Sequence, residues 1–297
     1  MAEYVLGAND RELERLRFQH EVWGGTTRAL CERAGLAPGM RVLDLGSGPG
    51  LVTEDLRERV GERGAVLALD ASAHWQLALA ERITERGWQN VRHVEARIEE
   101  ARLEGESFDF VFARWVFSFL PDPAAALAAV AQALAPGGVL AIQDYDHDGV
   151  GLFPASAGFD AMVRATRELY TRAGGDPWIA PRLPGLARRV GLEPFELTPH
   201  AIAGGPSSPG FRWADTFFPV FSETFVEQGL ASEAERRLFL EEWEERKRDP
   251  DSVFVSPLVV DFLARRPLGP SADRQSEEAA SSAPKVASAE SQSAPRS

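Results

Sequence analysis

The sequence has 297 residues, of which 44% are hydrophobic and 26% are charged, so it is long enough for one large globular domain or two modest ones. The formal net charge of −13 disfavours nucleic acid as a partner, because nucleic-acid binding rests on neutralising phosphates. Cys31 is the single cysteine, which excludes a disulfide within the chain and a Cys-x-x-Cys metal site. No apolar run reaches a membrane span, and the charged start lacks a signal peptide's apolar core. We therefore expect a cytoplasmic protein without a membrane partner.

Residues 1–38 are expected to form a helical lid. Leu13 and Leu16 lie three residues apart among charged side chains, which is typical of an amphipathic helix. Gly24-Gly25 is expected to break this helix, and Thr26–Ala34 to resume it. His20 on this helix is more often structural than functional.

From residue 39 onward, short apolar runs alternate with amphipathic stretches. The expected strands are Arg41–Leu45, Ala65–Leu69, Val91–Glu95, Phe108–Phe112 and Val139–Gln143. The expected helices between them are Gly50–Val60, Ala73–Arg86 and Pro123–Ala135. Strands separated by helices pair in parallel, so the sequence predicts an α/β fold with a doubly wound sheet and helices on both faces.

The spacing changes after residue 149. The expected elements there are the helices Phe159–Ala173 and Pro181–Val190, the strand Phe195–Ile202, the aromatic-rich stretch Phe211–Phe225, the helix Ser232–Arg248, and a last strand Val253–Leu263 antiparallel to Phe195–Ile202. We divide this part into the end of a domain at 39–205, an inserted helical cap at 206–250 and the last strand of the sheet at 251–267. The tail, 268–297, lacks aromatic residues and is expected to be disordered.

The strongest motif is Val42-Leu43-Asp44-Leu45-Gly46-Ser47-Gly48-Pro49-Gly50, in which an apolar strand enters a glycine turn that opens a helix. Glycines allow a ligand to approach the backbone, and the helix start offers free N–H groups. Asp44 at the strand end would repel a pyrophosphate but attract an ammonium. This pattern favours a ligand with an amino-acid head group.

The chain resembles the class I S-adenosylmethionine-dependent methyltransferases in four successive motifs between about Gly39 and Tyr145. They are VLDLGSGPG, the acidic strand end VLALD at Val66–Asp70, FDFVFARWVFSFLPDP at Phe108–Pro123, and LAPGGVLAIQDY at Leu134–Tyr145. The resemblance implies a Rossmann-like, seven-stranded sheet and S-adenosylmethionine as cofactor. It also implies that Asp70 holds the ribose hydroxyls, since a carboxylate can accept both. The cofactor-binding residues implied by the resemblance are Asp44, Gly46, Ser47, Gly48, Gly50, Asp70, Ala71, Arg97, Ile98 and Arg114.

The third strand departs from the family pattern. The family usually has a Gly-Asp pair there, whose Asp accepts the adenine amino group, whereas this chain has Val94-Glu95-Ala96-Arg97-Ile98. An arginine side chain cannot accept a hydrogen bond. The adenine edge is therefore expected to be bound by the backbone at Arg97 and Ile98, or by Glu99.

Several of these residues have structural alternatives. Asp44 could cap the following turn, and Trp75 has the spacing of a core residue. Arg114, which follows the fourth strand, could meet the methionine carboxylate or form a structural salt bridge. The aromatic side chains of Phe211–Phe225 lie at helical spacings of four, which fits a core face, a wall of the substrate pocket, or both.

Asp146 and His147 are the candidate catalytic residues. They follow the fifth strand, and ligands gather at the carboxyl ends of strands in such sheets. A histidine beside aspartates could take a proton from a substrate hydroxyl or amine. The same cluster could bind a divalent metal, as in some O-methyltransferases, although we assign no metal site, and a solvated loop is the structural alternative.

The sequence thus predicts a methyltransferase that acts on a small-molecule acceptor by in-line displacement of the sulfonium methyl. The acidic charge and the expected cap favour a small acceptor. The alternatives are a protein or RNA methyltransferase, and a non-catalytic protein that binds S-adenosylmethionine. The oligomeric state is not indicated by the sequence.

Overall fold

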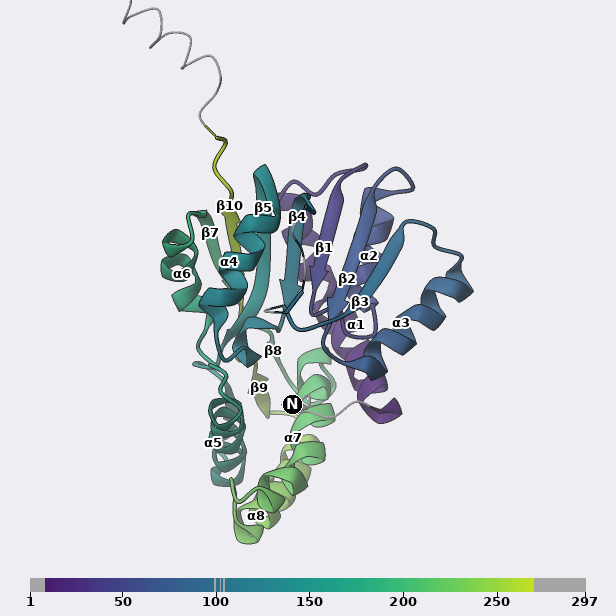
Figure 1. Cartoon of the computed structure of the whole chain (residues 1–297). Helices are drawn as coiled ribbons and strands as arrows, with labels where there is room; N and C mark the ends of the chain where they lie inside the picture. The colour runs from purple at the N-terminus through teal and green to yellow at the C-terminus, as the bar shows by residue number, and fades with distance from the viewer. Residues whose placement is uncertain (1–8, 99, 102, 104, 270–297) are drawn as a thin grey trace, which may run out of the picture. The chain divides into compact units, whose positions relative to one another are not determined.

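A seven-stranded sheet forms the centre of the computed structural model, which describes residues 9–98, 100, 101, 103 and 105–269 (Figure 1). The strand order is β3-β2-β1-β4-β5-β10-β7. The bounds are β1 Arg41–Leu45, β2 Ala65–Asp70, β3 Val91–Glu95, β4 Phe108–Arg114, β5 Leu134–Asp146, β7 Glu193–His200 and β10 Leu258–Arg265. The first five strands pair in parallel, and β10 is antiparallel to both β5 and β7. The predicted Rossmann-like α/β sheet is confirmed.

Helices cover both faces of this sheet, as right-handed crossovers require. One face packs against α1 Asp10–Arg33, α2 Leu51–Val60 and the end of α3 Ala73–Arg86. The other face packs against α4 Pro123–Ala133 and α6 Leu183–Arg189. Val42 points into the first of these two cores and Leu43 into the second, because successive side chains of a strand alternate between faces. Two short 3-10 helices, Phe117–Phe119 and Ala180–Arg182, complete the connections.

The helix α1 is continuous, so the predicted break at Gly24-Gly25 is wrong. Each glycine costs a helix about 1 kcal/mol relative to alanine. The burial of Trp23 and Leu30, both fully shielded from solvent, outweighs that cost. The helix also has a side-chain cap, because Asn9 accepts a hydrogen bond from the backbone N–H of Glu12 at 3.0 Å.

The predicted last strand, Val253–Leu263, is wrong as a single element. It is two strands, β9 Val253–Val255 and β10 Leu258–Arg265, separated by Ser256-Pro257. A proline has no N–H to donate to a ladder, so a central strand cannot run through Pro257. Only β10 joins the large sheet. The strand β9 lies between β6 Gly151–Phe153 and β8 Ala203–Gly204 in a small antiparallel sheet that the sequence did not indicate.

A helical layer lies at one end of the sheet and consists of α5 Ala157–Arg172, α7 Pro209–Glu227 and α8 Glu233–Arg248 (Figure 1). The sequence placed α5 with the sheet domain, but α5 packs against α7 and α8 through a shared aromatic core that includes Phe159, Phe218 and Trp243. The boundaries proposed for lid, sheet domain and cap therefore stay predictions. Of the predicted tail, residues 270–297 lie outside the described residues.

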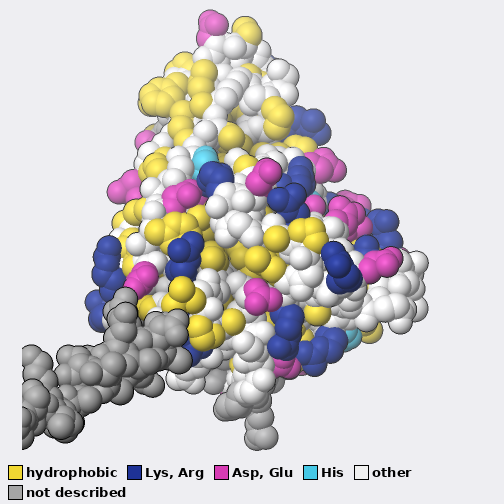
Figure 2. All heavy atoms as spheres, turned by 90° about the horizontal axis from the view of Figure 1, so that it is seen from above, with side chains coloured by type: hydrophobic (Ala, Val, Ile, Leu, Met, Phe, Trp, Pro, Cys, Tyr) yellow, Lys and Arg dark blue, Asp and Glu magenta, His cyan; other side chains and the backbone are white. Residues whose placement is uncertain are grey.

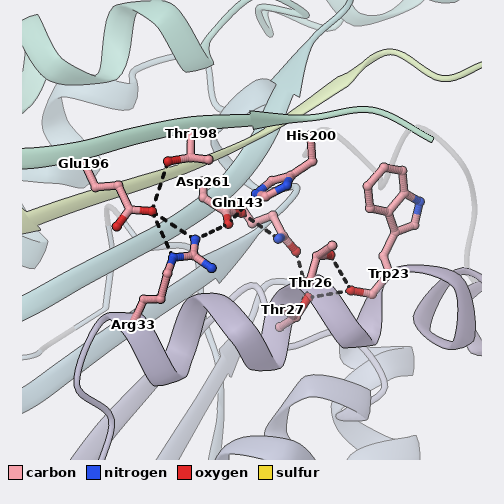
Figure 3. A network of polar contacts seen from close by, with 9 residues as sticks. All are labelled: Trp23, Thr26, Thr27, Arg33, Gln143, Glu196, Thr198, His200 and Asp261. Carbon is pink, nitrogen blue, oxygen red and sulfur yellow. Dashed lines mark hydrogen bonds and ion pairs between the residues drawn. The ribbon is translucent and has the colours of Figure 1, made fainter.

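A chain of buried polar side chains ties α1 to the sheet (Figure 3). Thr27 donates to Gln143 Oε1 at 2.7 Å, and Gln143 Nε2 donates to Asp261 Oδ1 at 2.7 Å. Arg33 Nη2 and His200 Nε2 each lie 2.7 Å from Asp261 Oδ2. Asp261 is fully buried on β10, so these contacts supply the partners that a buried carboxylate needs.

The close approach of α5 and α8 gives a test of this packing. A Cβ atom at Gly158 would lie 2.4 Å from the backbone of Phe239, whereas one at Gly185 on α6 would meet nothing within 4 Å. Gly158→Ala should lower the free energy of unfolding by about 1–3 kcal/mol, because the helix backbones must move apart. Gly185→Ala, the matched control, should leave it unchanged or raise it slightly. Thermal melts measure both, and equal melts would contradict the packing described.

Candidate functional site

A cavity of about 260 Å³ opens at the carboxyl ends of β1, β2 and β4. Nine of the ten residues predicted for cofactor binding line it: Asp44, Gly46, Ser47, Gly48, Asp70, Ala71, Arg97, Ile98 and Arg114. The tenth, Gly50, is not among the lining residues and instead begins α2 as its N-cap, in a left-handed conformation. Trp75 is buried, as the core alternative predicts, and also lines this cavity.

The glycine turn after β1 is fastened to the end of β2. Asp70 accepts a hydrogen bond from the backbone N–H of Gly48 through Oδ2 and one from Ser72 through Oδ1, each at 2.8 Å. Gly46 has φ +69°, and a Cβ there would lie 2.3 Å from Val116, so only glycine fits between β1 and the loop after β4. Asp70 thus holds the turn in place while its further lone pairs remain available for a ligand.

Asp44 is buried at the floor of the cavity. Its Oδ2 accepts a hydrogen bond from the Thr53 hydroxyl on α2 at 2.6 Å, a contact that the sequence did not predict. Burial raises the pKa of Asp44 to about 7, because the charged form is poorly solvated, while Thr53 and Arg114 partly oppose this shift. An ammonium group brought beside Asp44 would restore its charge.

Arg114 contributes a buried cation to the same cavity. Its Nη1 donates to Thr27 Oγ1 at 3.0 Å, and its Nη2 lies 3.2 Å from His20 Nδ1. Burial lowers the pKa of Arg114 to about 10. Within the described ranges, no carboxylate lies within ion-pair distance of Arg114, so the predicted structural salt bridge is not found there. A guanidinium with neutral partners is suited to a ligand carboxylate.

The third-strand residues that depart from the family pattern also lie at this cavity. Ala96, Arg97 and Ile98 line it, whereas Glu99 lies outside the described residues. Arg97 and Ile98 therefore lie at a wall of this cavity.

A second cavity, of about 70 Å³, adjoins the first, and Gln19, Trp115 and Phe119 line both. Its wall is mostly aromatic, with Tyr145 from β5, Tyr170 from α5, and Trp213, Phe217 and Phe218 from α7. The aromatic residues of α7 thus serve both as core and as pocket wall, so the two alternatives stated for them hold together.

Trp115 lines both cavities and has an unusual backbone conformation. Its φ is +55°, which is rare for a residue with a Cβ and is often found at functional sites. The conformation is held because its N–H donates to the carbonyl of Gln143 at 2.9 Å, while the next residue, Val116, donates to Asp144 Oδ2 at 3.1 Å. The indole stacks on Tyr145 with 5.6 Å between ring centroids.

His147 lies in the wall of the second cavity and is only 7% exposed, so the solvated-loop alternative is wrong for this side chain. Burial lowers the pKa of His147 to about 3, and the nearby Arg167 adds to the shift, so the imidazole is neutral. Asp146 lines neither cavity and accepts the backbone N–H of Asp148 at 3.0 Å. Of the two predicted catalytic residues, His147 therefore lines a cavity and Asp146 does not.

Many of the residues at the site were not predicted, among them Gln19 and Trp115, which line both cavities, and Thr53, which contacts Asp44. Trp115 directly follows the fourth strand, and residues at the carboxyl ends of strands in such sheets are candidates for ligand contact, so its position was the available signal. Thr53 and Gln19 give no signal of their own, because both look like ordinary helix residues. In the part of the chain that the structure describes, no group of three or more His, Cys, Asp or Glu side chains could hold a metal ion, and no helix is long and apolar enough to cross a membrane.

Comparisons with known proteins place a methyltransferase domain over the strands that form this cavity. Residues 43–142 match a family model described as a methyltransferase domain. The chain is 32% identical over 133 residues to the ubiquinone/menaquinone biosynthesis C-methyltransferase UbiE of Shewanella piezotolerans, covering 43% of this chain and 52% of that protein. It is 44% identical over 103 residues to the tRNA (adenine(58)-N(1))-methyltransferase TrmI of Thermus thermophilus, covering 34% of this chain and 38% of that protein.

A solved structure is also similar, that of phosphoethanolamine N-methyltransferase 2 of Haemonchus contortus in complex with S-adenosyl-L-methionine. Its TM-score is 0.50 at 20% sequence identity, and the match covers 82% of this chain and 52% of that chain. This likeness shows the fold. The sequence matches span about half or less of the length of the two curated relatives.

The position of Asp70 predicts its effect on cofactor binding. If Asp70 holds the ribose hydroxyls, Asp70→Ala should weaken S-adenosylmethionine binding at least ~10-fold, because two charge-assisted hydrogen bonds to the ribose would be lost and the turn at Gly48 released. Asp70→Asn, which keeps one acceptor, should lose less. Calorimetric titration with melts of the ligand-free proteins measures this. Equal affinities would refute the ribose assignment, and collapsed melts would make Asp70 structural.

The raised pKa of Asp44 predicts a pH dependence. With a pKa of about 7, its carboxyl in the ligand-free protein is mostly protonated at about pH 6 and must lose that proton to pair with the ligand's ammonium. Affinity should therefore rise from about pH 5.5 to 7, by at most about tenfold per pH unit. Asp44→Asn should bind more weakly and without this rise. The same pH slope in both proteins would contradict the pairing.

Proposed function

We propose that this chain, which carries a class I S-adenosylmethionine-dependent methyltransferase domain, transfers a methyl group to a small organic acceptor held in the second cavity. The observation that supports this most is the shared wall of Gln19, Trp115 and Phe119. A cofactor bound in the first cavity would lie next to a second, largely apolar space, and small-ligand sites are usually lined in this way.

The charges of the first cavity fit the cofactor's amino-acid head group. Among the described residues, neither the buried cation of Arg114 nor the buried carboxyl of Asp44 has an oppositely charged group within ion-pair distance, although the two influence each other's pKa across the cavity. We assign the methionine carboxylate to Arg114, the ammonium to Asp44, the ribose hydroxyls to Asp70 and the adenine edge to the backbone at Arg97 and Ile98. The glycine turn Gly46–Gly50 gives these groups room beside the backbone.

When bound, S-adenosylmethionine supplies a methyl group on a sulfonium, which the acceptor takes as the carbon–sulfur electron pair returns to sulfur. The chain's own residues hold the acceptor in line with the methyl–sulfur bond and exclude water. Positioning of this kind supplies much of the rate enhancement. The aromatic walls of the second cavity, which include Tyr145, Tyr170 and Phe217, position the acceptor and keep water out. The acceptor must also lose a proton, and His147 lines this cavity with a neutral imidazole. Because a pKa of about 3 makes that imidazole a weak base, this role requires its pKa to rise when the acceptor binds.

His147→Ala tests this last role. Turnover should fall by about 10²–10⁴-fold, as is typical when a proton acceptor is lost, while affinity for S-adenosylmethionine should change little, because His147 does not line the cofactor cavity. His74→Ala, an exposed histidine on α3, is the control. Full activity of the His147 variant would remove it from the reaction.

A screen with methyl-labelled S-adenosylmethionine tests the function itself. The protein should transfer label to a component of a small-metabolite extract and not to bulk tRNA or protein. Binding of S-adenosylmethionine without any transfer would support the non-catalytic alternative. Binding of neither S-adenosylmethionine nor its demethylated product would refute the assignment of the first cavity.

RNA methylation is the second candidate, favoured by the similarity to the TrmI tRNA methyltransferase. That similarity covers 34% of the chain. The net charge of −13 opposes binding to a polyanion. Figure 2 shows a face on which basic and acidic side chains are interspersed, whereas a nucleic-acid surface gathers basic ones. Label transfer to tRNA in the screen would decide for this candidate.

A further inference from the structure

Two buried nitrogen atoms in the wall of the second cavity have no hydrogen-bond partner in the described part of the chain: Trp115 Nε1 and His147 Nε2. Both rings contact Tyr145, with centroid distances of 5.6 Å for Trp115 and 5.0 Å for His147. Buried polar groups in folded proteins are almost always paired. The side chains that carry them line one cavity, which makes an occupant of that cavity the candidate partner of both nitrogens.

The rest of this cavity is largely apolar, although Gln19 and Thr166 also line it, and it carries no net charge. Its lining includes the rings of Phe119, Tyr170, Phe217 and Phe218, and no acidic residue lines it within the described ranges. Arg15 is the one lining residue with a permanent charge, and Glu12 matches it through two hydrogen bonds of 2.7 and 2.8 Å. An ionised occupant would be buried here without a counter-charge, which is strongly unfavourable.

The chemistry of the two nitrogen atoms narrows the occupant further. The indole N–H can only donate, so it requires an acceptor atom on the ligand. Nε2 of a neutral imidazole donates in one tautomer and accepts in the other. A hydroxyl group both donates and accepts, so it can pair with Nε2 in either tautomer. A protonated amine has no acceptor to offer the indole. A carboxylate could accept from the indole and from the Nε2–H tautomer, but its charge would be buried without a counter-charge.

We propose that the acceptor is a neutral aromatic molecule bearing a hydroxyl group, whose ring packs among Trp115, Tyr145 and Tyr170 and whose hydroxyl hydrogen-bonds to His147. The lowered pKa of His147, about 3, agrees with this, because the imidazole stays neutral at physiological pH. The inference rests on the proposed function for the methyl transfer, whereas the recognition of the hydroxyl can be measured without any transfer.

The experiment uses four one-ring probes of similar size: p-cresol, toluene, benzylamine and benzoate. Each is titrated into the full chain saturated with S-adenosylhomocysteine at neutral pH, and binding is followed by ligand-observed NMR. A site built to hydrogen-bond a hydroxyl discriminates against the analogue that lacks it. We expect p-cresol to bind at least about tenfold more tightly than toluene, and benzylamine and benzoate to bind more weakly than p-cresol.

Variants separate hydrogen bonding from packing. The p-cresol to toluene affinity ratio should fall to about one in His147→Phe, which keeps a ring but has no nitrogen, and in His147→Ala. The affinity ratio is insensitive to a change in cavity size, because such a change affects the binding of p-cresol and of toluene equally. His74→Ala should keep the wild-type ratio.

The outcomes distinguish this inference from the proposed function. A wild-type ratio near one, an unchanged ratio in both His147 variants, or preferred binding of benzylamine or benzoate would overturn the inference. Label transfer to amines or carboxylic acids alone would overturn it while leaving methyl transfer established. A hydroxyl preference that depends on His147, in a protein that transfers no methyl group, would support the inference and refute the proposed function.

Discussion

A carboxylate buried in the middle of the sheet must be paired, and Asp261 is paired by three different elements of the fold. Its oxygens lie 2.7 Å from donors on Gln143 of β5, Arg33 of α1 and His200 of β7. Removing one partner of a buried ion pair is strongly destabilising. This requirement holds α1 against the sheet, and α1 carries the side chains that reach both cavities.

The same polar chain runs on to the cofactor cavity. Thr27 donates to Gln143 and accepts from Arg114, so the buried guanidinium is positioned by the network that satisfies Asp261. Fully satisfied buried networks of this kind favour one arrangement of their members. The proposed site for the methionine carboxylate is thus fixed by residues far apart in the sequence, on α1, β4, β5 and β10.

The sequence was sufficient for those parts of the molecule that local pattern determines. Parallel strands and the glycine turn follow from periodicity and from Gly46, and nine of ten predicted cofactor residues line one cavity. What depends on tertiary packing was missed. The burial of Trp23 carries α1 through Gly24-Gly25, Pro257 divides the last strand, and α5 leaves the sheet for α8. Trp115 and His147 were difficult for the same reason, because their importance comes from two cavities that no sequence spacing reveals.

The continuity of α1 has a consequence for how ligands enter and leave the two cavities. Leu16 lines the first cavity, Arg15 the second and Gln19 both, so a single turn of one helix faces the two spaces together. Gln19 Oε1 also accepts a hydrogen bond from Trp213 Nε1 of α7 at 3.0 Å, which connects that turn to the helical layer. Because this turn faces both cavities, a movement that displaced it would open both of them together.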